Sequence, residues 1–273
     1  MGDLLSLTAV NYANEDRLIQ LVRDKNITSM VNDELEKYFT DKSHTTEIPA
    51  EIYMDAISED YLNTIIESKI HGGFAVLSRS GYDAPNITNA KLETNLDNFY
   101  SDYAKKIGYE KDEKYEKKLQ SSKVSAYKII EEYCDVFKFG ALSKHGVLKK
   151  VMPVYIRLGS MLAVSIVSAV VLAVILLLVN LKGVSAVVYW LGTSSLIAGI
   201  LGAAPCAYLL CTDYFSAFTI KQAQIYTAYT GTMDMVTKGF LTASVIAAVS
   251  GIVLLLIYGV ISRFNGKEKS AVK

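Results

Sequence analysis

The feature that most constrains this chain is a run of 24 residues, Leu158–Leu181, without a charged side chain. As a helix rising about 1.5 Å per residue, such a run is long enough to cross a hydrocarbon core about 30 Å thick. Two further runs without Asp, Glu, Lys, Arg or His follow at Val184–Leu210 and Phe240–Ile261. The sequence therefore predicts three transmembrane spans in the second half of the chain.

The first 152 residues have a different character. They carry 20 Lys and Arg against 25 Asp and Glu, whereas residues 153–273 carry 8 against 3. An acidic domain offers no basic surface to displace counterions from phosphates, so we expect no nucleic acid partner. The basic half suits anionic headgroups of a lipid bilayer, which is the expected partner of the spans. Only one of the three cysteines, Cys134, lies before the spans, so this part has no internal disulfide.

Apolar side chains recur at helical spacing through the first 152 residues. Asn26 is expected to cap a helix at Ile27–Phe39, and Ser58 is expected to cap one at Glu59–Ile70. The pair Gly72-Gly73 is then expected to end that second helix. Patterns of this kind, with no run of paired strands, are typical of an all-helical domain.

The sequence therefore predicts an all-α fold with a helical soluble domain at residues 1–152 and a three-helix transmembrane bundle within residues 153–263. Residues 264–273 form a basic tail. Between the second and third spans, Thr212–Lys238 is rather polar but keeps aromatic residues at helical spacing. We interpret it as an interfacial or protruding amphipathic helix, and a fourth span is the less favoured interpretation.

Small residues four apart mark one side of each predicted span. They are Ser165, Ala169 and Ala173 in the first span, Ser195, Gly199, Ala203 and Ala207 in the second, and Gly239, Ala243, Ala247 and Gly251 in the third. Such ridges let helix backbones approach closely, which is how helices associate within lipid. We expect these ridges to pack the three spans together, and docking of a membrane partner or an identical subunit is the alternative.

Motifs for catalysis or ligand binding are not evident in the sequence. The three histidines have no Cys or second His at a metal-ligand spacing, and no G-x-S-x-G or phosphate-binding loop occurs. The densest carboxylates are Glu131, Glu132 and Asp135, which we interpret as a solvated acidic face. We therefore predict no catalytic residue, no metal and no cofactor, and we expect that the protein is not an enzyme.

The order of the parts resembles a set of uncharacterised polytopic membrane proteins of Gram-positive bacteria. The residues that carry this resemblance are Leu4–Val10, Asn26-Ile27-Thr28 with the helix after it, Glu47–Tyr53, and the block of three spans. The resemblance implies a multi-pass protein of the cell membrane with an extracytoplasmic domain, and it implies that Leu4–Val10 ends a first membrane helix. The other interpretation of that stretch is the apolar start of a helix, in which case the domain would by default stay in the cytoplasm. The positive charges that flank the three spans, six on one side and five on the other, do not decide between these orientations.

The favoured function is therefore non-enzymatic display of a helical domain for interaction with a partner or the cell envelope. The alternative is a permease, a channel or an accessory subunit of a membrane transport complex. Transporters of ions usually place ionisable groups at membrane depth, and the three spans contain none, so the alternative is less favoured.

Overall fold

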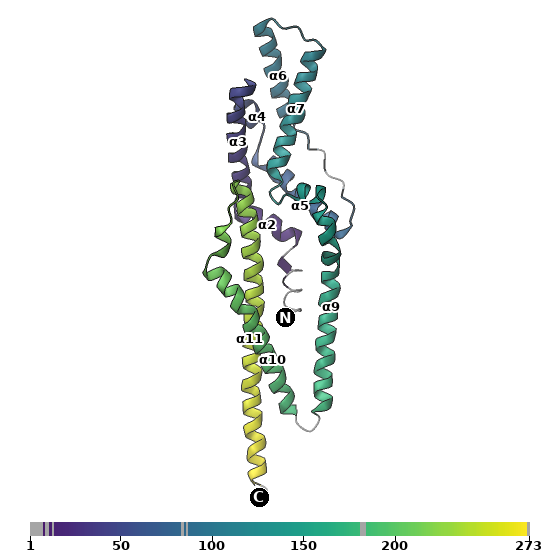
Figure 1. The fold of residues 1–273 in the computed structure, drawn as a ribbon, viewed down its shortest axis with the longest axis vertical. Coiled ribbons are helices and arrows are strands. Elements are labelled where there is room, and N and C mark those ends of the chain that lie inside the picture. Colours follow the sequence, from purple (N-terminus) through teal and green to yellow (C-terminus); the bar gives the residue numbers. More distant parts are fainter. Residues whose placement is uncertain are drawn as a thin grey trace. The chain divides into compact units, whose positions relative to one another are not determined.

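The computed structural model of the chain describes residues 8, 11, 12, 14–82, 85, 87–180 and 184–271, with the backbone alone at 184 and 264–271. The described helices are α2 (Glu15–Asp24), α3 (Ile27–Thr46), α4 (Ala50–Met54), α5 (Glu59–Ser78), α6 (Ala90–Ile107), α7 (Glu113–Cys134), α8 (Phe139–Lys144), α9 (Val147–Val179), α10 (Val184–Cys211) and α11 (Ala223–Ala271), with a 3₁₀ turn, η1, at Tyr214–Ala217 (Figure 1). No strand occurs among these residues. The predicted all-α fold is confirmed, because three long apolar helices follow a helical N-terminal region.

The chain forms two compact units. The first, called the helical domain below, comprises residues 15–153 and 219–231. The second, called the membrane unit, comprises residues 1–14, 154–218 and 232–273. The segment 219–231, which includes the first turns of α11, therefore belongs to the helical domain.

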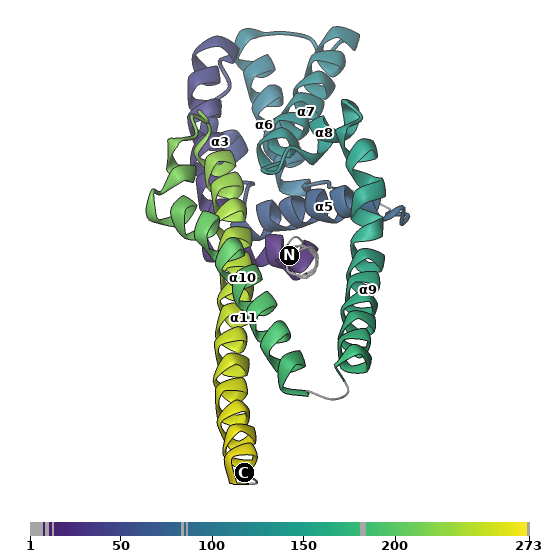
Figure 2. The same cartoon turned by 60° about the horizontal axis from the view of Figure 1, so that its bottom comes forward.

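The centre of the helical domain is α5, which packs against α2, α3, α7 and α8 (Figure 2). The predicted cap of this helix is confirmed, because the Ser58 hydroxyl accepts a hydrogen bond of 3.2 Å from the backbone N–H of Tyr61. Apolar residues three and four apart along α5 and its neighbours are almost completely buried, as amphipathic packing requires. Among them are Val31, Leu35, Leu62, Ile65, Ile66, Ile70, Leu92, Leu96 and Ile130.

One predicted helix end is wrong, and one predicted side-chain cap is absent although its helix, α3, begins at Ile27 as expected. Gly72-Gly73 does not stop α5, which continues to Ser78 and ends at Arg79 in the left-handed region, with φ of 58°. Both glycines lie inside the helix, and a side chain at one of them, Gly73, would collide with Phe139 of α8. Asn26 makes no side-chain cap; it has φ of 52° and forms the tight joint between α2 and α3. Asparagine tolerates this left-handed conformation better than most residues, which explains its place at the joint.

The amphipathic helix predicted in Thr212–Lys238 corresponds to the start of α11, and it packs on protein. Gln224, Ile225 and Ala228 are buried, and the Tyr229 hydroxyl donates a hydrogen bond of 2.8 Å to the carbonyl of Phe137. An apolar stripe on a polar helix suits a protein surface as well as a membrane interface, and here the helical domain covers it. The interfacial interpretation is therefore wrong for residues 223–231.

The membrane unit holds three helices that are long and apolar enough to cross a bilayer, in α9, α10 and α11. The mean hydropathy of their apolar windows is 3.2, 1.7 and 2.6 respectively. These helices contain the predicted spans except for the last two residues of the first: Asn180 follows the end of α9, and Leu181 lies outside the described residues. Of the stretch Leu4–Val10 only Thr8 is described, so the expected end of a preceding membrane helix also lies outside them.

Candidate functional site

The helical domain contains a cleft of about 520 Å³ between α5, α7, α8 and the first turn of α9. Such a volume lies within the range of about 300–1,000 Å³ that is usual for small-molecule sites. One wall is apolar and includes Val76, Phe139 and Leu148. The other carries Lys69 and Glu131. The cleft therefore combines apolar surface with several polar groups.

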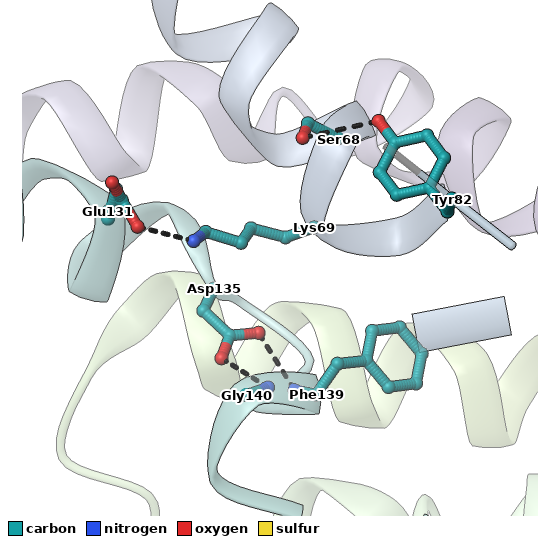
Figure 3. A network of polar contacts seen from close by, with 7 residues as sticks. All are labelled: Ser68, Lys69, Tyr82, Glu131, Asp135, Phe139 and Gly140. Carbon is teal, nitrogen blue, oxygen red and sulfur yellow. Dashed lines mark hydrogen bonds and ion pairs between the residues drawn. The ribbon is translucent and has the colours of Figure 1, made fainter. Parts of the chain in front are cut away.

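The polar end is built by an ion pair that joins α5 to α7. Lys69 Nζ lies 2.6 Å from Glu131 Oε2 (Figure 3). Their side chains are 29% and 43% exposed, so solvent screens the pair and it contributes modestly to stability. Both groups consequently present charge to the cleft while holding the two helices in register.

A second polar contact joins two residues that line the cleft. The Tyr82 hydroxyl donates a hydrogen bond of 3.3 Å to the hydroxyl oxygen of Ser68 (Figure 3). Further along, the Tyr127 hydroxyl accepts from the backbone N–H of Asn89 and donates to Glu93, both at 3.0 Å. Burial, together with the hydrogen bond to Glu93, raises the pKa of Tyr127, so this phenol remains a neutral donor.

Asp135 organises the short helix α8, which forms one side of the cleft. Its two carboxylate oxygens accept hydrogen bonds of 2.8 Å from the backbone N–H groups of Phe139 and Gly140 (Figure 3). This is the arrangement that a helix N-terminus favours, because its first N–H groups lack partners within the helix. The residue is only 9% exposed, so the prediction of a solvated acidic face is wrong for Asp135. Its role is to position α8, and both oxygens are engaged in doing so.

The close approach of α8 to α5 depends on a glycine. A Cβ atom built on Gly73 would lie 2.6 Å from Cδ2 of Phe139, well inside van der Waals contact. The Phe139 ring also packs against Phe74 and Phe137, with centroids 5.9 and 5.8 Å away. The absence of a side chain at Gly73 thus makes room for the Phe139 ring, which lines the cleft.

A cysteine and a histidine, residue types that often take part in covalent chemistry, lie in the helices around the cleft. The Cys134 side chain is completely buried, and burial raises the pKa of its thiol far above the usual range. His71 lies inside α5, where its ring nitrogen Nδ1 contacts a carboxylate oxygen of Glu15. Among the described residues, no group of three or more His, Cys, Asp or Glu side chains could hold a metal ion.

The small-residue ridges predicted in the three spans differ in whether they contact another helix. Ser195 and Gly199 of α10 contact α11: the Ser195 hydroxyl donates to the carbonyl of Ala247 at 2.8 Å, and a Cβ atom on Gly199 would lie 2.7 Å from Cα of Ala248. Gly251 lies in the same contact, where its Cβ atom would be 2.7 Å from the carbonyl oxygen of Gly192.

The other ridge residues are outside this close contact or only beside it. Gly239 lies against the ring of Tyr12, whereas Ala203, Ala207 and Ala243 are half-buried. On α9, Ser165 and Ala173 are half-buried and Ala169 is exposed. None of the residues in the apolar window of α9 is buried by another described part of the chain.

The cleft itself was not foreseen from the sequence. Lys69 and Glu131 are 62 residues apart and neither belongs to a recognisable motif. Asp135 offered the only local signal, an acidic residue shortly before a short helix. Comparison with known proteins adds no further assignment, because no protein-family model, curated protein or solved structure matches the chain.

Proposed function

We propose that the protein is a multi-pass membrane protein that displays its helical domain outside the cytoplasm and binds a partner, or a component of the cell envelope, through the cleft. The observation that carries the proposal is the cleft, whose apolar wall and paired charges suit recognition of a side chain or a small ligand. The residues around it that could do covalent chemistry are engaged elsewhere, since Asp135 caps α8 and the Cys134 thiol is buried. Binding without catalysis is the simplest use of such a site.

The proposed topology has the domain on one side of the bilayer and the tail on the other. Its support is that residues 219–231, which lie between the apolar parts of α10 and α11 and include the first turns of α11, belong to the same compact unit as residues 15–153. A chain that crosses three times returns to its starting side after the second crossing, so these two segments would share one side. The outward orientation follows the resemblance in layout to proteins of Gram-positive bacteria.

Cysteine labelling tests this topology in cells. In a variant without native cysteines, single cysteines are placed at Lys117 in the helical domain, at Lys221 in the link and at Ser270 in the tail. A membrane-impermeant maleimide should label Lys117→Cys and Lys221→Cys in intact cells, and Ser270→Cys only after lysis. Labelling of Lys117→Cys and Lys221→Cys from opposite sides would contradict the three-span topology, whereas labelling of both only after lysis would contradict the outward orientation.

Photo-crosslinking tests the cleft as the recognition site. A photoreactive phenylalanine analogue in place of Ser143, which lines the cleft, should give a defined adduct in cells. Val76→Trp would fill the apolar wall and should abolish that adduct. The matched control is Val124→Trp, because Val124 is 57% exposed on α7 and does not line the cleft. Equal adduct yields in the two tryptophan variants would show that the partner does not use the cleft.

A further inference from the structure

The stretch that leads into the first span has an unusual charge composition. Between Asp135 and Asp213 the chain contains no Asp or Glu, yet the part of this stretch that precedes the span contains five Lys and Arg residues. The rest of the first 152 residues is acidic overall, so this is a local excess of positive charge. It belongs to α8, the turn after it and the start of α9.

Three lysines of this stretch, Lys144, Lys149 and Lys150, are exposed. None of them lies within 4.0 Å of a carboxylate oxygen of the described residues. Some other lysines do have such partners, as Lys69 and Lys123 do at 2.6 and 2.7 Å. The three lysines therefore present full positive charges that the described protein does not neutralise.

The local fold fixes where these charges lie. Leu148, between them, is only 4% exposed and lines the cleft, so it anchors the first turn of α9 in the helical domain. The following lysines occupy other sides of that turn and remain in solvent. Lys144 ends α8 just before the turn at Gly146, whose φ is +71°.

The distance along α9 from Lys150 to the start of the predicted span is short enough for a lysine side chain to reach the headgroup layer. The apolar part of α9 from Leu158 to Val179 would span about 33 Å at 1.5 Å per residue, close to the thickness of a hydrocarbon core. Lys150 precedes Leu158 by eight residues, or about 12 Å along the helix. The headgroup layer covers roughly half of that distance, and the flexible stem of lysine can cover the remainder.

We propose that Lys144, Lys149 and Lys150 form a binding surface for the phosphate of anionic lipid headgroups. A lipid is the fitting occupant because the helix that carries two of these lysines continues directly into a span. Each lysine near an anionic surface contributes about fivefold to binding, so loss of all three should weaken it by roughly a hundredfold when the contributions add. The attraction is electrostatic and should fall as salt is raised. This surface is independent of the partner proposed for the cleft.

Native mass spectrometry of the full-length protein in neutral detergent tests the proposal. Phosphatidylglycerol should give lipid adducts at roughly a hundredfold lower concentration than phosphatidylcholine. The triple variant Lys144→Ala/Lys149→Ala/Lys150→Ala should lose this preference, whereas replacement of the same three by Arg should keep it. The matched control is Lys106→Ala/Lys114→Ala/Lys117→Ala, which removes three exposed lysines near the α6–α7 connection and should also keep it.

Two results would overturn the proposal. If the triple alanine variant and the matched control retain the same preference for phosphatidylglycerol, the juxtamembrane lysines do not bind the headgroup. If millimolar glycerol 3-phosphate displaces the lipid as well as phosphatidylglycerol itself does, the surface recognises a soluble phosphate and not a membrane lipid.

Discussion

The adjacent glycines of α5 should respond in opposite directions to the same substitution. Replacing glycine by alanine inside a helix stabilises it by about 0.5–1 kcal/mol when the new methyl group fits. At Gly72 it fits, because a Cβ atom would lie 3.6 Å from Cδ1 of Tyr82, an ordinary contact. Gly72→Ala should therefore raise the free energy of unfolding by that amount.

At Gly73 the same methyl group would overlap the Phe139 ring, with Cδ2 2.6 Å away. Forcing extra volume into packed contacts typically costs about 1–3 kcal/mol, which exceeds the gain in helix propensity. We therefore expect Gly73→Ala to destabilise the domain and to differ from Gly72→Ala by about 2 kcal/mol. For a domain of this size that corresponds to roughly 4–8 °C in Tm.

Cys134 provides an assay that reports on the helical domain within the full-length protein. Its side chain is completely buried and burial raises the pKa of its thiol, so it should react with a maleimide dye only when the domain unfolds. A Cys206→Ala/Cys211→Ser background leaves this thiol as the single reporter during a thermal ramp in detergent. If both glycine variants lower Tm equally, as a helix stop with left-handed glycines would require, the reasoning from side-chain space is refuted.

Three further substitutions test other parts of the molecule. Gly199→Leu should separate α10 from α11 and lower the Tm, which can be followed by the fluorescence of Trp190. Gly259→Leu should change the Tm little, because a Cβ atom at Gly259 meets nothing within 4 Å. Equal effects of the two variants would contradict the close contact between α10 and α11. Asp135→Asn should cost about 1–2 kcal/mol in the thiol assay, because the amide retains only one of two acceptor oxygens for the α8 N-terminus; an unchanged Tm would contradict the capping role. Burial raises the pKa of Tyr53 to about 12, so its contribution to stability is full below about pH 10 and is lost as pH rises toward 12, by roughly 3 kcal/mol in total. In denaturation curves followed by circular dichroism, Tyr53→Phe should lose less stability over that interval than the parent, and an equal loss would contradict this assignment.

The three apolar helices and the Ser58 cap could be predicted because their signals are local. A charge-free run or a hydroxyl before a helical pattern is recognisable without knowing what it contacts. The prediction that Gly72-Gly73 ends α5 failed because it used the same local kind of signal, and a glycine at a helix end cannot be distinguished in sequence from a glycine packed under an aromatic ring. Only the position of Phe139, about 65 residues later, distinguishes the two.

The cleft could not be predicted because no single segment contains it. Its charges, Lys69 and Glu131, come from α5 and α7, and its apolar wall includes Leu148 from the start of α9. Helical periodicity tells which face of each helix is apolar, but it does not tell which helices become neighbours. The start of α11 shows the same limit, since its amphipathic pattern was correct and the surface that covers it was not foreseen.

The membrane helices show why small residues alone do not determine packing. A strict spacing of four advances about 400° around a helix, so a ridge of that spacing drifts by about 40° at each step. Helices that cross at about 20° instead keep contact through an average spacing of 3.5 residues. The buried positions of α10 follow that rule, since Gly192 and Gly199 are seven apart, and Ser244 and Gly251 do the same on α11.

The presence of glycine at facing positions therefore distinguishes α10 and α11, which contact each other closely, from α9. On α10 and α11 the facing seams each contain glycine, where the backbones come close enough that added methyl groups would overlap. The single glycine of α9, Gly159, has nothing within 4 Å of its Cβ position, and the ridge from Ser165 to Ala173 consists of serine and alanine. A methyl or hydroxymethyl group at every step keeps a neighbouring backbone farther away and weakens the dispersion contacts on which association in lipid depends. The same small-residue pattern thus forms a close helix contact where glycines oppose each other, and it does not do so along α9, whose apolar window is not buried by the described residues.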